Sequence, residues 1–214
     1  MATVSQPQSR LDALRSGIRL EIVTNVWMTL EALVAMGAGV MAGSILLIAF
    51  GADSVIELIS GIVLLWRLTT EATTGDTERI EKVERRATRI SFVLLVLLCL
   101  YVAITTLIGV VWRAEPEGSP VGIIVSIGAL IFMPLLARAK RGINQRLGST
   151  ALRADIVESI TCAYMAGAVL VGLALNAALG WWWAEYVAAA VLLYWLVGET
   201  REALEAARGD ESDE

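Results

Sequence analysis

The chain is organised around long apolar stretches that carry almost no charge. Two of them, Ile90–Trp112 and Gly118–Ala137, contain no charged residue, and each is long enough to cross a ~30 Å hydrocarbon layer as a helix. The mean hydropathy of +0.67 and the hydrophobic content of 57% exceed what a soluble domain of this size needs. The sequence therefore predicts an all-α membrane protein.

Two longer apolar blocks, Ile22–Trp66 and Ala154–Gly198, cover 45 residues each. Either block would run to roughly 67 Å as a single helix at ~1.5 Å per residue, so each predicts two crossings and a turn. We therefore expect a bundle of six transmembrane helices in one domain over 22–200, between an N-terminal segment 1–21 and an acidic tail 201–214. The expected spans are about 22–42, 45–67, 90–112, 118–137, 152–176 and 181–199.

Basic residues predict the orientation of these spans, because lysine and arginine collect in cytoplasmic loops. Six spans with both termini in the cytoplasm place 16 of the 17 basic residues there and leave only Arg113 outside. Trp112 and the run Trp181–Trp183 then fall at the outer interface, where indole rings prefer to lie. We expect a bilayer as the environment, in a bacterial inner (cell) membrane, and no nucleic acid as a partner.

Segments outside the spans are expected to be helical extensions. The charged segment 69–89 should extend span two or three into the cytoplasm. The tail should form one short helix, Glu199–Arg208, before a disordered acidic end.

Acidic side chains occur inside the expected spans, at Glu31, Asp53, Glu57, Asp155 and Glu158. Such a charge costs about 2.5 kcal/mol or more at a helix centre. Asp53 and Glu57 are four residues apart and share one helix face, where two carboxylates repel each other. No lysine or arginine lies within an expected span to neutralise them, so these groups should recruit a proton or a cation from solution.

Span five carries a second pair on one face, Glu158 and Cys162, at a depth comparable to that of Glu57. If spans two and five meet, the carboxylates of Asp53, Glu57 and Glu158 and the Cys162 thiolate would surround one point. A set of four mixed oxygen and sulfur ligands suits a divalent transition metal such as zinc. The chain has no histidine, so a histidine metal site is excluded.

Other interpretations of these residues remain open at this stage. The acids could line a water-filled cavity or join helices through polar contacts, and Cys162 and Cys99 could simply pack. Asp155 could cap the start of span five, which we favour slightly, or support the metal ligands. Glu31 could support the ligands, carry protons, or pair with Asn25. The basic loop 138–153 is most simply a topology signal with some affinity for anionic lipid.

Three segments resemble the cation diffusion facilitator family, whose members export zinc and related divalent metals in exchange for protons. The segment Gly43–Glu57 is similar to that family's end of span one and start of span two, including Ala-Asp-Ser with a second acid four residues after the aspartate. Leu147–Asp155 is similar to its entry to span five, and Trp183–Glu185 to its entry to span six.

The resemblance implies six spans with cytoplasmic termini, metal ligands at Asp53 and Glu57, and a homodimer. Glu158 stands where the family usually has histidine, and Cys162 where it usually has aspartate. Glu185-Tyr186 replaces the common Asp-Pro of span six. We expect a short, divergent member limited to the membrane domain.

The leading hypothesis is a secondary transporter that exports a divalent metal, zinc first, by proton antiport, with the metal as substrate and no prosthetic group. The alternative is a non-transporting membrane protein that keeps the fold and binds metal or assists assembly. An intramembrane enzyme is not expected, because the sequence has no histidine, no serine–lysine arrangement and no phosphate-binding loop.

Overall fold

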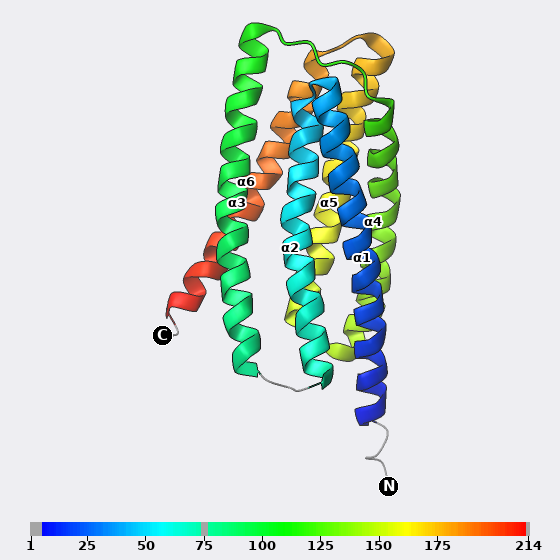
Figure 1. The fold of residues 1–214 in the computed structure, drawn as a ribbon, viewed down its shortest axis with the longest axis vertical. Coiled ribbons are helices and arrows are strands. Elements are labelled where there is room, and N and C mark those ends of the chain that lie inside the picture. The colour runs from blue at the N-terminus through cyan, green and yellow to red at the C-terminus, as the bar shows by residue number, and fades with distance from the viewer. Residues whose placement is uncertain (1–5, 74–76, 213–214) are drawn as a thin grey trace.

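The structure, a computed structural model, describes residues 6–73 and 77–212, and within these ranges every long element is a helix. The helices alternate in direction along one bundle axis, as Figure 1 shows. Their bounds are α1 Gln6–Ala42, α2 Ile45–Thr73, α3 Thr77–Trp112, α4 Pro120–Leu147, α5 Thr150–Leu179 and α6 Trp183–Ser212.

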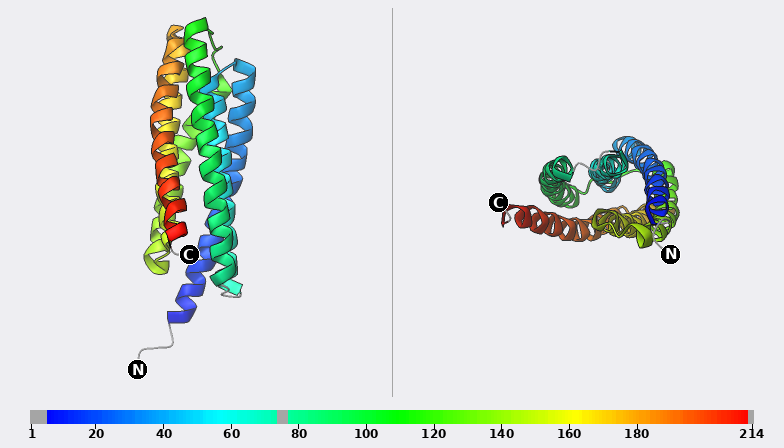
Figure 2. Two further views of the ribbon diagram at one scale, coloured as in Figure 1. Left: turned by 90° about the vertical axis from the view of Figure 1, so that its left-hand side faces the viewer. Right: turned by 90° about the horizontal axis from the view of Figure 1, so that it is seen from below.

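In the described part of the chain five helices are long and apolar enough to cross a membrane. This confirms the prediction of an all-α membrane protein, whereas the count of six spans stays a prediction. The candidate spans in the described residues are Leu11–Ala42, Ile45–Thr73, Phe92–Trp112, Pro120–Leu147 and Ala151–Leu179. Helix α6 packs along α3 and α5 and contacts α2 (Figure 2). It continues without a break to Ser212, so the segment expected as a separate short helix, Glu199–Arg208, is the last part of α6.

The turns between helices have clear local causes. Gly148 and Gly180 take left-handed backbone angles, with φ of 66° and 67°, and close the ends of α4 and α5. Glycine has no Cβ to oppose this conformation. Ser119 and Ser149 begin α4 and α5 as N-caps, because each hydroxyl accepts a hydrogen bond from a backbone N–H of the first turn.

The two ends of the bundle differ in composition. We call one the basic end; it holds the start of α1, the α4–α5 turn and the described ends of α2 and α6. The other, the tryptophan end, holds Trp112 and Trp181–Trp183, next to the α1–α2 turn. Three of these indoles are well exposed: Trp112 at 81%, Trp181 at 44% and Trp183 at 48%.

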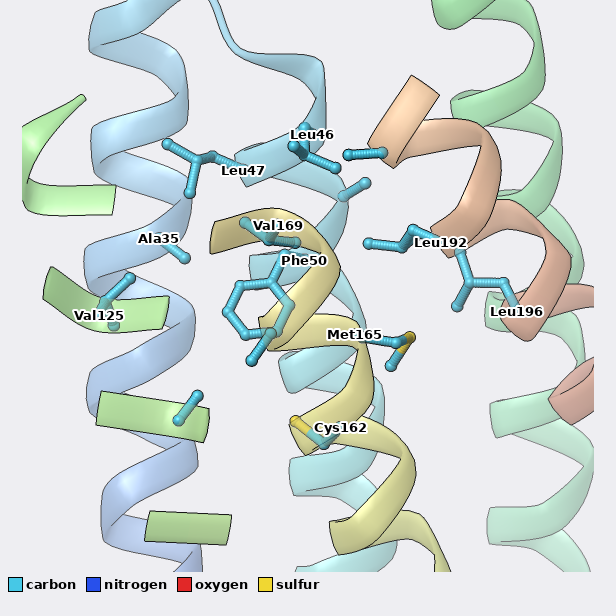
Figure 3. Packing of buried hydrophobic residues seen from close by; sticks show 14 of the residues in the cluster. Ala35, Leu46, Leu47, Phe50, Val125, Cys162, Met165, Val169, Leu192 and Leu196 are labelled. Atoms are coloured by element: carbon cyan, nitrogen blue, oxygen red, sulfur yellow. The ribbon is translucent and has the colours of Figure 1, made fainter. Parts of the chain in front are cut away.

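The bundle hides polar groups and exposes apolar ones. Glu31, Asp53 and Lys140 are each 1% exposed, whereas Val40 is 70% exposed. This pattern fits a lipid surround rather than water, because buried charge requires partners and exposed aliphatic surface does not. Figure 3 shows part of the apolar core between α2, α5 and α6, where Phe50, Cys162 and Leu192 belong to one buried cluster.

Candidate metal centre

Helix α2 lies inside the bundle, in contact with α1, α3, α5 and α6. Its approach to α1 is close because Gly51 has no side chain: a Cβ there would lie 2.6 Å from Met36 Cγ and 2.8 Å from the Met36 backbone nitrogen. This packing leaves the next two acids of α2, Asp53 and Glu57, only 1% and 2% exposed.

Asp53 and Glu57 form a pair of buried acids on one helix. Among the residues that the structure describes, none of their four carboxylate oxygens takes part in a hydrogen bond. The two carboxylates repel each other, and each also feels the negative charges of Glu158, Glu31 and Glu199. A buried, crowded and unpartnered pair of carboxylates is stable only with bound protons or a cation.

Helix α5 packs against α2 and brings Glu158 and Cys162 to this region. Glu158 is half-buried and lies within electrostatic range of both α2 acids. Cys162 is 1% exposed, and its thiol donates to Glu31 Oε1 at 3.7 Å and also lies close to Glu57. Glu158 and Cys162 of α5 therefore each lie within electrostatic range of Asp53 and Glu57 of α2.

Glu31 joins this region from α1. Its Oε1 accepts a hydrogen bond from Ser54 at 2.8 Å, and its Oε2 accepts one from Trp27 Nε1 at 2.7 Å. Trp27 is held in turn by stacking on Phe132 of α4, with ring centroids 4.7 Å apart. The partners of Glu31 are thus Ser54, Trp27 and Cys162, and the pairing with Asn25 considered from the sequence is not formed. Glu31 therefore contacts both Ser54, the residue after Asp53, and the Cys162 thiol.

Glu199, which was expected to belong to the tail, is a further acid of this region. Helix α6 carries this side chain to within electrostatic range of Asp53, Glu57 and Glu158. The adjacent Thr200 fixes this part of α6 against α3, where its hydroxyl lies 3.5 Å from Cys99 Sγ. The only signal in the sequence was an acid directly after the apolar run of the last span, which equally suits a helix leaving the membrane.

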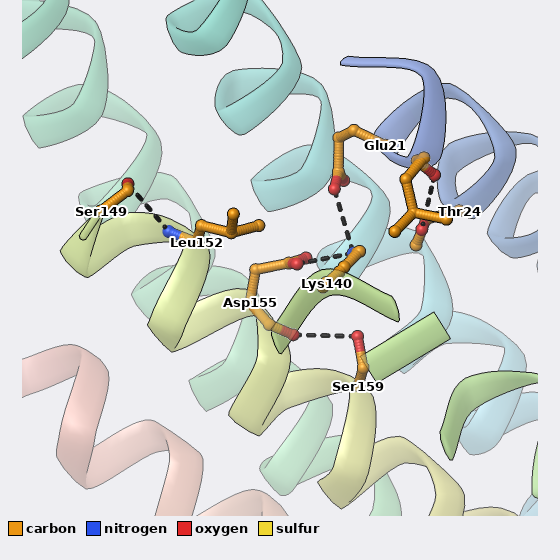
Figure 4. A network of polar contacts seen from close by, with 8 residues as sticks. Glu21, Thr24, Lys140, Ser149, Leu152, Asp155 and Ser159 are labelled. Atoms are coloured by element: carbon orange, nitrogen blue, oxygen red, sulfur yellow. Dashed lines mark hydrogen bonds and ion pairs between the residues drawn. The ribbon is translucent and has the colours of Figure 1, made fainter. Parts of the chain in front are cut away.

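A buried basic residue, Lys140, lies on α4 at a position that the sequence assigned to the loop 138–153. Helix α4 continues past Ala137 to Leu147, and Lys140 is 1% exposed within it. Its Nζ lies 3.0 Å from Glu21 Oε2 and 2.5 Å from Asp155 Oδ2, so one ammonium joins α1, α4 and α5 (Figure 4). We call these three side chains the lysine triad.

The lysine triad also corrects the interpretation of Asp155. The N-cap of α5 is Ser149, whose hydroxyl accepts from Leu152 N at 3.3 Å. Asp155 lies further along the helix and forms an ion pair instead of a cap, because the buried ammonium of Lys140 gives its carboxylate a far stronger partner than a free N–H of the first turn. Lys140 also acts electrostatically on Glu158, one turn along α5.

A second polar network closes the tryptophan end. Glu185 at the start of α6 is 2% exposed and accepts hydrogen bonds from Ser44 at 2.5 Å and from Asn176 at 2.6 Å. Asn176 Nδ2 also donates to the Pro116 carbonyl at 3.0 Å. We call Ser44, Asn176 and Glu185 the Glu185 network; it ties together the α1–α2 turn, the end of α5 and the start of α6.

The acids of α2 and α5 influence each other electrostatically, but their carboxylates are not arranged to coordinate one metal ion. Over residues 6–73 and 77–212, no three cysteine, aspartate or glutamate side chains are grouped closely enough to hold one metal ion. Zinc–oxygen contacts of about 2.0–2.2 Å would require the carboxylates to turn toward a common point.

Comparison with known protein families assigns this chain to a family. The family model described as the cation efflux transmembrane domain matches residues 22–208, which is most of the chain and includes at least part of every described helix. The protein belongs to the cation efflux family. The members of that family are transporters of metal cations.

One curated relative is described as an uncharacterized transporter and comes from Synechocystis sp.. It is 26% identical to this chain over 153 residues, which is 70% of the chain and 49% of the relative. The chain thus spans about half the length of the curated relative that it matches.

Proposed function

We propose that the protein exports a divalent metal cation, zinc first, in exchange for protons, and that Asp53, Glu57, Glu158 and Cys162 bind the metal. The observation that carries this proposal is the pair of buried α2 carboxylates without a hydrogen-bond partner in the described residues. Lys140, the basic side chain of the lysine triad, already forms ion pairs with two other acids, Glu21 and Asp155. A cation from solution is the simplest remaining source of positive charge.

The donor set suits zinc better than magnesium or calcium. Zinc accepts both carboxylate oxygen and thiolate sulfur in four-coordinate sites, whereas the two hard cations take oxygen ligands almost exclusively. Cys162 is therefore the residue that should set the preference for a softer metal. We further propose that Glu199 adds negative charge to the site from α6 and that Glu31 orients the Cys162 thiol.

Proton exchange follows from competition for the same groups. Metal binding requires the carboxylates and the thiol to be deprotonated, so protons and metal exclude each other at this site. Metal would bind from the cytoplasmic side, the bundle would then open toward the tryptophan end, and protons from that side would displace the metal.

Several further features belong to the same proposal. We place all six helices across the membrane, with both termini and the basic end in the cytoplasm, as the charge distribution supports. The transmembrane domain comprises residues 22–200, and the tail 201–214 stays in the cytoplasm. We expect a homodimer in a bacterial inner membrane.

Zinc uptake into proteoliposomes, with and without a pH gradient, tests the proposal. Asp53→Asn and Glu158→Gln should abolish uptake, since each removes one negative ligand while keeping the side-chain shape. Glu115→Gln is the matched control, because Glu115 is an exposed acid at the tryptophan end. If the Asp53 and Glu158 variants accumulate zinc like the wild type, the site assignment fails.

The second candidate function, a metal-binding or assembly membrane protein without transport, is favoured by Glu158 and Cys162, which stand where the family usually has histidine and aspartate. Equilibrium zinc binding, measured on the same samples, separates the two. Binding that Asp53→Asn removes, without zinc flux in correctly inserted wild-type protein, would support this second candidate.

A further inference from the structure

A surface pocket lies between the end of α4 and the start of α5, at the basic end, and none of the acids of the metal centre lines it. It has a volume of about 340 Å³ and is lined by Arg141, Asn144, Gln145, Arg153, Ile156 and Val157. The lining combines two guanidinium groups and two amides with two aliphatic side chains. We call it the arginine pocket.

The two arginines of the arginine pocket have no acidic partner in the part of the chain that the structure describes, where the ion pairs of basic side chains involve other residues. By contrast, the ammonium of the preceding residue, Lys140, forms ion pairs with two carboxylates. Two exposed guanidinium groups that line one pocket suit the binding of an oxyanion, because each arginine can donate two parallel N–H hydrogen bonds to a phosphate.

The aliphatic side of the pocket identifies the kind of oxyanion. Val157 is 53% exposed, and it lies one turn beyond Arg153 toward the bundle centre. The exposed face of α5 remains apolar further along, where Val171 is 58% exposed. An occupant that places a phosphate on the arginines and a hydrocarbon chain along this face satisfies both parts of the surface.

We propose that the arginine pocket binds the headgroup of an anionic phospholipid, with its phosphate between Arg141 and Arg153 and an acyl chain along Val157. The lipid would belong to the leaflet at the basic end. By bridging α4 and α5, the bound lipid would hold the start of the helix that carries Glu158 and Cys162. The proposal concerns the membrane environment, and it stands whether or not the protein transports zinc.

Native mass spectrometry of the full chain, titrated with phosphatidylglycerol or phosphatidylcholine in detergent, tests this assignment. The wild type should bind one phosphatidylglycerol per chain with at least tenfold preference over phosphatidylcholine. The double variant Arg141→Gln/Arg153→Gln should lose at least tenfold in phosphatidylglycerol affinity. The matched control Arg138→Gln/Arg146→Gln, which removes two exposed charges that do not line the pocket, should bind like the wild type.

Three outcomes would overturn the proposal. Equal losses in both double variants would mean that the lipid responds to net charge alone. Equal binding of the two lipids would remove the role of the anionic headgroup. Displacement of the lipid by millimolar inorganic phosphate or glycerol phosphate would identify a site for free phosphate. Helix content and gel-filtration elution, unchanged in both variants, establish that each is folded.

Discussion

Replacing Lys140 by methionine should destabilise the bundle by about 3–5 kcal/mol, which is the usual cost of removing one partner from a buried ion pair. Lys140 Nζ lies 3.0 Å from Glu21 and 2.5 Å from Asp155, and the three side chains are only 1%, 1% and 8% exposed. Water therefore screens these charges little. Methionine matches the length and apolar stem of lysine, so the loss isolates the charge and not the packing.

The cost arises from the carboxylates that remain. In Lys140→Met, Glu21 and Asp155 stay buried without the ammonium, and each must take up a proton or draw in water. Removing their charges as well, in Lys140→Met/Glu21→Gln/Asp155→Asn, should recover part of the lost free energy of unfolding, because no unpaired charge is left. Recovery of stability after two further substitutions is not expected if the residues only fill space.

Equilibrium unfolding in mixed micelles measures these differences, with Arg138→Met as the matched control on the same helix. Arg138 is exposed, and its replacement should change the free energy of unfolding by less than about 0.5 kcal/mol. A loss for Lys140→Met no larger than that of Arg138→Met would refute the buried triad. A triple variant less stable than Lys140→Met would refute the charge argument.

Three further predictions concern packing, closure and the metal centre. Gly51→Ala should cost about 1–3 kcal/mol of unfolding free energy, because the added methyl meets the α1 backbone at 2.8 Å, whereas Gly37→Ala, with nothing within 4 Å, should not destabilise. Glu185→Ala should open the tryptophan end and raise maleimide labelling of Cys162 from that side several-fold; unchanged labelling would mean that the Glu185 network does not close the bundle. Glu199→Gln should weaken zinc binding about tenfold, or ~1.4 kcal/mol, in isothermal titration, while neutralising an exposed acid of the same helix should not; equal affinities would exclude Glu199 from the site.

The sequence by itself determined the class of the protein. Uncharged stretches such as Ile90–Trp112 have no stable alternative to a helix in lipid, because every backbone polar group must be paired within the segment. The spacing of Asp53 and Glu57 fixed their common face, since it depends only on the helical period. The family relationship followed from the same local signals, and the match over residues 22–208 confirms it.

Only the tertiary structure decided which charges meet. The sequence predicts Lys140 to be a loop residue, because a charge after an apolar run usually marks the end of a span. It became an interior residue because α4 continues to Leu147 and because Glu21 and Asp155, distant in sequence, approach it from α1 and α5. Glu199 was reassigned for the same reason. Local pattern predicts where a helix can form, but the partner of a buried charge depends on how helices pack, and that information is not contained in any one segment.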